Sequence, residues 1–204
     1  MMDEILTKEF RLYSNEYFTN RRDPRRETAY RQDAEKIRAR MGGEFLAVDF
    51  GGGYGEFGKY LDCVYHCYDP FTGYDELPDV QADVAIFRGV LQHIYNPVEM
   101  LAFAYDHLLP GGLLAVLATP DTDSIGYLRF GTLPALDAPR NWIPFGHRML
   151  GNVLTRLGFV GIELAWPYGK PYARPLRDLW NFAVGKPCAF PGNMMECFAR
   201  KNDQ

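Results

Sequence analysis

The chain has 204 residues, of which 47% are hydrophobic and 24% are charged, and its formal net charge is −4 at pH 7. This length fits one α/β domain with a short appendage, and the composition is that of a globular protein rather than a disordered one. The acidic balance argues against a dedicated nucleic-acid binder, because such proteins usually carry a basic surface.

Residues 1–43 are predicted to form a helical cap. Apolar residues recur at spacings of three or four from Tyr30 to Met41, which gives one apolar stripe on a helix. Gly42 and Gly43 are expected to end this helix. The basic run at 21–26 is interleaved with an acid, so a solvated helix face is the favoured interpretation.

Residues 44–119 alternate between strand and helix patterns, as right-handed βαβ units do. A helix is expected to start at residue 56. The Asn96-Pro97-Val98-Glu99 stretch has the residues typical of a helix start, and the Gly111-Gly112 pair is expected to end that helix. The predicted strands of this half are 44–49, 63–68, 83–87 and 113–118.

Residues 120–204 are predicted to form the substrate side of the same single domain. Residues 120–147 are rich in Pro, Gly and Asp and are expected to form a long loop with short helical pieces. A helix is expected at 148–157, with Gly158 as its cap, and an amphipathic piece at 176–182. The last two strands are expected at 160–166 and 194–200.

The four cysteines form no C-x-x-C pair, which favours buried, reduced thiols over a zinc site. We therefore expect no metal. The chain opens with Met1-Met2-Asp3-Glu4, which is not the start of a signal peptide. The most apolar stretch, 108–118, is interrupted by a Pro-Gly-Gly sequence and is too short to span a bilayer. A cytoplasmic location is the resulting expectation.

A glycine cluster follows the first predicted strand and places backbone N–H groups and a helix N-terminus beside a ligand. Residues 53–58 satisfy G-x-G-x-x-G, the fingerprint of nicotinamide dinucleotide sites. Asp49 lies two residues before Gly51, however, and a carboxylate there suits a cationic ligand better than a pyrophosphate. S-adenosylmethionine carries a sulfonium and an ammonium group and no phosphate. Asp69 ends the second strand and can accept both ribose hydroxyls, which either cofactor would need.

Several segments resemble the class I S-adenosylmethionine-dependent methyltransferases, in particular the quinone and sugar methyltransferase branch. Val48 to Gly55 looks like the family's D-x-G-x-G-x-G motif, and Tyr68-Asp69-Pro70 looks like its ribose-binding acid. Further matches follow in the family's order, at residues 83–94, 108–114 and 139–145. Gln92-His93 stands where many members of that branch carry Glu-His. Together the matches run from residue 45 to about 160, which is over half of the chain.

The resemblance implies a Rossmann-like sheet of seven strands with an antiparallel last strand, and a cofactor at the carboxyl ends of the strands. Residues 70–82 are too few for the family's helix and third strand, so we expect six strands, with the third abbreviated or missing. Phe71, Tyr74 and Leu77 are conjectured to pack on the adenine instead. The implied cofactor contacts are Asp49, Phe50, Gly51, Gly53, Tyr54, Gly55, Asp69, Pro70, Arg88 and Gly89.

The leading hypothesis is O-methylation of a small molecule or of a saccharide biosynthetic intermediate. His93 is the first candidate base and His147 the second, because a neutral imidazole takes a proton near neutral pH. For His93 a purely structural role is about equally expected. Asp83 is expected to satisfy backbone N–H groups. A lid over the cofactor, or a contact to an anionic substrate, is a possible role for Tyr17, Phe18 and the arginines at 21–26. A plain surface helix is the favoured interpretation of these residues.

Two other functions stay open at this point. The overlapping G-x-G-x-x-G leaves a nicotinamide-dependent oxidoreductase as one alternative, although Asp49 and the lack of a convincing Tyr-x-x-x-Lys pair oppose it. A non-catalytic, cofactor-binding partner subunit is the other, because Gln92 replaces the usual Glu and the sheet is shortened. The sequence does not indicate the acceptor or the oligomeric state.

Overall fold

The computed structural model describes residues 26–74, 76–136, 140–167, 174–188 and 192–203. The suggested lid residues Tyr17 and Phe18, and the arginines at 21, 22 and 25, lie outside these ranges. Within them, no helix is both long and apolar enough to cross a membrane.

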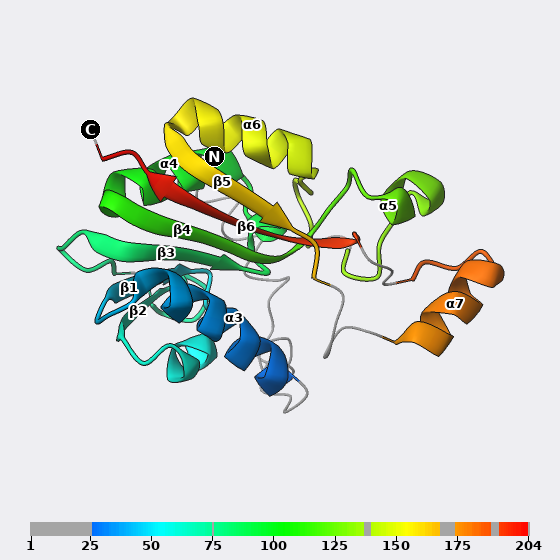
Figure 1. Ribbon diagram of the computed structural model, residues 1–204, viewed down its shortest axis with the longest axis horizontal. Coiled ribbons are helices and arrows are strands. Elements are labelled where there is room, and N and C mark those ends of the chain that lie inside the picture. The colour runs from blue at the N-terminus through cyan, green and yellow to red at the C-terminus, as the bar shows by residue number, and fades with distance from the viewer. Residues whose placement is uncertain (1–25, 75, 137–139, 168–173, 189–191, 204) are drawn as a thin grey trace.

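A mixed sheet of six strands forms the centre of the described structure, in the order β2-β1-β3-β4-β6-β5 (Figure 1). β2, β1, β3 and β4 pair with one another in parallel, whereas β6 runs antiparallel to both β4 and β5. The expected Rossmann-like methyltransferase sheet, with its antiparallel last strand, is thereby confirmed. The strands are β1 (Leu46–Phe50), β2 (Val64–Tyr68), β3 (Ala82–Arg88), β4 (Leu108–Pro120), β5 (Phe159–Ala165) and β6 (Met194–Lys201).

The shortened stretch after Asp69 explains why the sheet has six strands. Among its described residues, Asp69 and Tyr74 form an isolated antiparallel bridge, and no helix or strand is present before Ala82. β2 is therefore the edge strand beside β1. This outcome agrees with the prediction that the third strand of the family is missing.

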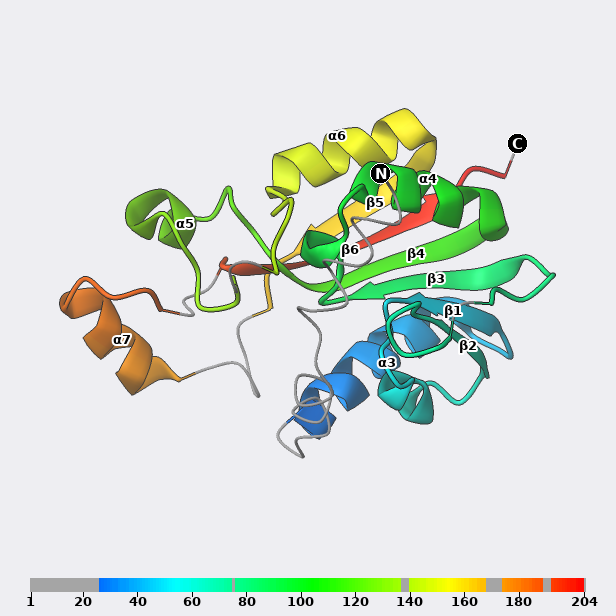
Figure 2. The ribbon, with the colours of Figure 1, turned by 180° about the vertical axis from the view of Figure 1, so that it is seen from behind.

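Helices cover both faces of the sheet, as Figures 1 and 2 show from opposite sides. α4 and α6 pack on one face, where Leu101, Leu150 and Leu154 meet one core cluster. α3 and η3 pack on the other, where Ile37 and Phe57 meet a second cluster. The helices are α3 (Glu27–Met41), η3 (Glu56–Tyr60), η4 (Leu91–His93), α4 (Pro97–His107), α5 (Ile125–Phe130), α6 (His147–Leu157) and α7 (Pro175–Ala183).

Helix ends follow the local rules that the sequence indicates. The Asn96 side chain accepts from the Glu99 N–H at the start of α4, and Pro97 occupies the first turn. Gly42 and Gly158 end α3 and α6 with positive φ angles of 73° and 95°. An L-residue adopts this left-handed conformation at a cost, whereas glycine does not.

One predicted boundary is wrong. α4 ends at His107, and the Gly111-Gly112 pair lies inside β4 rather than between the helix and the strand. Leu108 already pairs with Ala82, and the next registered pair is Leu113 with Val84, so residues 109–112 form a bulge. The helix stops early because a long-range strand pairing competes with it, and that pairing is not visible in the local sequence.

Candidate functional site

A hollow of about 430 Å³, counting the part open to solvent, lies where β1 and β3 end. This is the carboxyl edge of the parallel strands, where open α/β sheets bind their ligands. Five predicted cofactor contacts, Asp49, Gly51, Gly53, Tyr54 and Arg88, line it. Its full lining is Tyr30, Asp49, Gly51, Gly52, Gly53, Tyr54, Glu56, Phe57 and Arg88.

The glycine loop bends sharply around one side of this hollow. Gly51, Gly53 and Gly55 have φ angles of 76°, 64° and 72°, a region that disfavours any side chain. A Cβ at Gly51 would also overlap the side chain of Val90. Both the conformation and the space therefore require glycine at position 51.

Asp49 brings a buried carboxylate to the hollow. The residue is 1% exposed, and the Tyr65 hydroxyl donates to its Oδ2 at 2.7 Å. Burial, and then the charge of Asp49, raise the pKa of Tyr65 far above its ordinary value. Tyr65 therefore remains a protonated donor and holds the carboxylate in place.

A largely buried ion pair that borders the hollow was not predicted. The Arg88 guanidinium contacts Asp33 Oδ2 at 2.9 Å and lies over the Tyr30 ring, 4.3 Å from its centroid. Tyr30 and Asp33 share one face of α3, and Asp33 is an acid within an otherwise apolar stripe. That pattern was the available signal, because a buried acid needs a partner elsewhere in the fold.

His93 links two loops near the same edge of the sheet. Its Nδ1 donates to the Arg140 carbonyl at 2.9 Å, and the Trp142 N–H donates to the Gln92 carbonyl at 2.9 Å. A carbonyl can only accept, so Nδ1 carries the proton and the neutral ring has its lone pair on Nε2. The structural role anticipated for His93 is thus present, and this tautomer is also compatible with a base.

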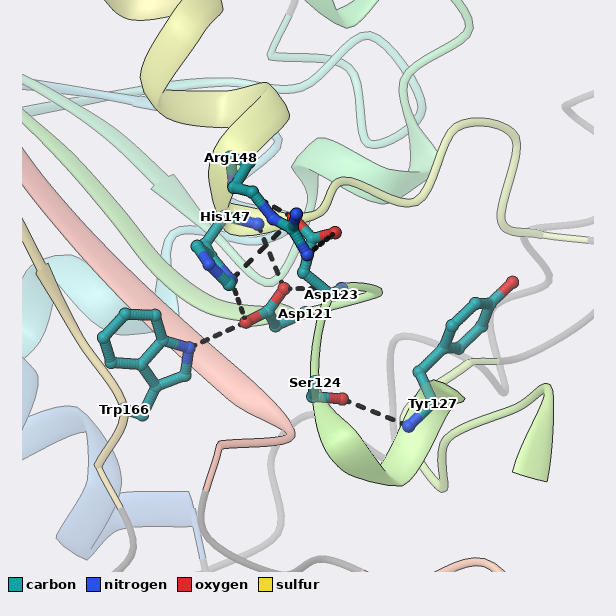
Figure 3. A network of polar contacts seen from close by, with 7 residues as sticks. All are labelled: Asp121, Asp123, Ser124, Tyr127, His147, Arg148 and Trp166. Carbon is teal, nitrogen blue, oxygen red and sulfur yellow. Dashed lines mark hydrogen bonds and ion pairs between the residues drawn. The ribbon is translucent and has the colours of Figure 1, made fainter. Parts of the chain in front are cut away.

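His147 is the first residue of α6 and belongs to a second set of polar contacts, shown in Figure 3. Its Nδ1 lies 2.9 Å from Asp121 Oδ2, and Asp121 directly follows the end of β4. Trp166, just after β5, donates from Nε1 to the same oxygen at 2.8 Å. A carboxylate, an imidazole and an indole therefore meet beyond the carboxyl end of β4.

Comparison with known proteins decides what this framework belongs to. A sequence model of the methyltransferase domain family matches residues 25–164. The chain belongs to this family. Membership makes it an S-adenosylmethionine-dependent methyltransferase and replaces both the nicotinamide-dependent oxidoreductase and the non-catalytic subunit as interpretations. Among curated proteins, no sequence matches.

Solved structures of methyltransferases share the fold at low sequence identity. The 1,6-didemethyltoxoflavin N1-methyltransferase of Burkholderia thailandensis is 16% identical with a TM-score of 0.61, over 98% of this chain and 90% of that one. An S-adenosylmethionine-dependent methyltransferase of Archaeoglobus fulgidus is 15% identical with a TM-score of 0.54, over 84% and 94%. The CurJ carbon methyltransferase is 16% identical with a TM-score of 0.52, over 97% and 58%.

These similarities confirm the fold of the methyltransferase and leave its acceptor open. The Burkholderia enzyme is named for methylation at nitrogen and the CurJ enzyme for methylation at carbon. One fold thus carries different acceptor atoms, because the acceptor is chosen by side chains rather than by the sheet.

The remaining predicted cofactor contacts do not line the hollow. Asp69 is buried and accepts from the Gly53 and Phe71 N–H groups at 2.8 and 3.0 Å, so it holds the glycine loop. The Phe50 side chain stacks on Phe87 in the core, with ring centroids 5.0 Å apart, so only its main chain faces the loop. A ribose contact at Asp69 stays a prediction.

The other contacts expected near the nucleoside lie in turns or outside the lining. Pro70 is exposed, and Gly55 and Gly89 shape turns through positive φ angles. The residues conjectured to hold adenine, Phe71, Tyr74 and Leu77, are absent from the lining, where the aromatic rings belong to Tyr30, Tyr54 and Phe57. Asp83 has its expected structural role and accepts from the Leu46 N–H at 2.8 Å.

Cys67, behind the glycine loop, is predicted to resist alkylation. Burial, and then the charges of Asp49 and Asp69, raise the pKa of its thiol to about 12. The thiolate is the reactive form, and its fraction falls as the pKa rises. At neutral pH, iodoacetamide should therefore label Cys67 more than tenfold more slowly in the folded protein than in urea, as followed by mass spectrometry. Equal rates in the two states would show that the thiol is neither buried nor faced by these carboxylates.

Proposed function

We propose that this methyltransferase transfers a methyl group to a hydroxyl oxygen of a small molecule or saccharide intermediate, in the cytoplasm. The observation that carries the oxygen acceptor is the Asp121–His147 contact beyond the carboxyl end of β4. Sulfonium methyl transfer needs positioning above all, but a hydroxyl nucleophile also needs a base, whereas a neutral amine does not.

The lining of the hollow carries charged groups and aromatic rings that suit S-adenosylmethionine. The carboxylates of Asp49 and Glu56 suit its ammonium and sulfonium groups, and the Arg88 guanidinium suits its carboxylate. The rings of Tyr30, Tyr54 and Phe57 offer apolar surface to the adenine. When bound, the cofactor supplies an electrophilic methyl group on sulfur. The chain itself binds and orients both molecules and accepts the hydroxyl proton.

Incubation with S-adenosylmethionine labelled in its methyl group tests this function. We expect label in products from hydroxyl probes, such as phenol or a nucleotide-activated hexose, and none in a matched primary amine. The Asp49→Asn variant, which lacks the proposed cofactor carboxylate, serves as the negative control. Label found only in the amine would contradict an oxygen acceptor while leaving methyl transfer intact.

A further inference from the structure

Asp121 is the most densely contacted acid in the network of Figure 3. It is fully buried, and four donors converge on its two oxygens. The N–H groups of Asp123 and His147 donate to Oδ1 at 2.9 and 3.0 Å. Trp166 Nε1 and His147 Nδ1 donate to Oδ2 at 2.8 and 2.9 Å. These contacts fix the carboxylate without leaving it room to rotate.

This carboxylate sets the tautomer of His147. A carboxylate bound by four donors is acceptor-only, so the proton of the neutral imidazole lies on Nδ1 and its lone pair on Nε2. Among the described residues, Nε2 has no hydrogen-bond partner, and the side chain is 28% exposed. The ring also stands edge-on to Trp166, with centroids 5.2 Å apart and planes at 90°. The imidazole is thus held at Nδ1 and remains partly exposed to solvent.

Two simpler roles explain only part of this geometry. Asp121 and Asp123 both accept from main-chain N–H groups at the start of α6, where Gly146 offers no side-chain cap. Capping does not require His147 Nδ1 and Trp166 Nε1 to meet at the same oxygen of Asp121, however. Asp121, Asp123 and His147 are also residue types that bind metals. The two oxygens of Asp121 already accept from four donors, which fill the lone-pair sites that a cation would need.

We propose that His147 is the general base of methyl transfer and that Asp121 is its positioning residue. This inference rests on the proposed hydroxyl acceptor. Nε2 takes the hydroxyl proton while the oxygen's electron pair forms the new bond to the methyl carbon. The carbon–sulfur bond breaks and its electron pair stays on sulfur. Asp121 stabilises the imidazolium until the proton passes to solvent.

The first test reads the imidazole without any cofactor or acceptor. Nitrogen-15 NMR of the histidines should show the Nδ1–H tautomer at His147 in the wild type. The tautomer should be retained in Asp123→Asn, a matched control that removes the charge of the second carboxylate. It should be lost in Asp121→Asn, whose amide N–H can donate to Nδ1. An Nε2–H tautomer in the wild type, or identical spectra in the two variants, would overturn the proposal.

The second test compares turnover on the hydroxyl probes. His147→Gln should lower kcat by about 100-fold or more, the usual contribution of a general base, with an unchanged Kd for S-adenosylmethionine. Added imidazole should restore part of the turnover of His147→Ala. In His147→Gln, turnover should fall less with 4-nitrophenol than with phenol, because 4-nitrophenol ionises readily without a base. A cap or a packing residue would produce neither effect. Thermal unfolding checks that each variant folds. If a variant does not fold, the nitrogen-15 NMR spectrum of the wild type still tests the tautomer of His147.

Two carboxylates lie close to the imidazole. These are Asp121 and, 3.9 Å from Nδ1, Asp123, which pairs with Arg148 at 3.4 Å. If His147→Gln methylates the hydroxyl probes as fast as the wild type, His147 is not the base, and the proposed O-methyltransferase activity stands. A wild type that binds cofactor and methylates no hydroxyl probe would reject both.

Discussion

Replacing Asp49 with Asn should raise the Kd for S-adenosylmethionine by roughly 100-fold, which corresponds to about 3 kcal/mol. The residue is 1% exposed, and it lines the same hollow as Arg88. A cationic ligand placed there loses its opposite charge when the side chain becomes an amide, and water screens that loss poorly at a buried site. Isothermal titration calorimetry measures the change directly.

Tyr65→Phe is the matched control for this prediction. It removes the hydroxyl that donates to Asp49 Oδ2 at 2.7 Å but keeps the ring and the carboxylate. We expect this variant to lose less cofactor affinity than Asp49→Asn, because the carboxylate keeps its charge and loses only a donor that positions it. If Asp49→Asn and the wild type bind S-adenosylmethionine with equal affinity, Asp49 does not contact the cofactor.

Gly51→Ala should destabilise the protein by about 3 kcal/mol and abolish cofactor binding at 37 °C. At φ 76°, a side chain costs about 1–2 kcal/mol in backbone strain. The new Cβ would overlap Val90, and overpacking adds about 1–3 kcal/mol. Gly51 cannot move away easily, because its N–H donates to the Tyr68 carbonyl at 2.7 Å. Urea unfolding followed by circular dichroism gives the free energy of unfolding.

Gly42→Ala separates the two costs at position 51. Gly42 has nearly the same φ, 73°, but no atom lies within 4 Å of the place that an added Cβ would take. This variant should therefore lose only about 1–2 kcal/mol, the cost of the left-handed backbone. In Gly51→Ala, adding Val90→Ala should recover part of the loss. Equal destabilisation at positions 42 and 51 would show that contact with Val90 contributes nothing.

Local patterns predicted most of the fold. The apolar stripe of α3, the start of α4 at Asn96 and the glycine ends of α3 and α6 depend on neighbouring residues, so the sequence displays them. The start of β4 depends instead on pairing between Leu108 and Ala82, which are distant along the chain. A helix pattern and a bulge both fit the local sequence there, and the sheet decides between them.

The candidate site divides in the same way. The Asp49 carboxylate and the glycine loop lie within seven consecutive residues and were predicted together. Arg88 meets Asp33 across 55 residues, and His147 meets Asp121 across 26, so neither contact has a local signature. His147 was the second candidate from sequence because nothing near it in the chain identifies Asp121 as its partner.

A crystal structure with S-adenosylhomocysteine tests the central claim most directly. The product's amino group should lie at Asp49, its carboxylate on the Arg88 side, and its adenine among the rings of Tyr30, Tyr54 and Phe57. The thioether sulfur should face the carboxyl end of β4, toward His147. Density for the nucleoside outside this hollow, or a site in which Asp49 makes no contact with it, would contradict the account.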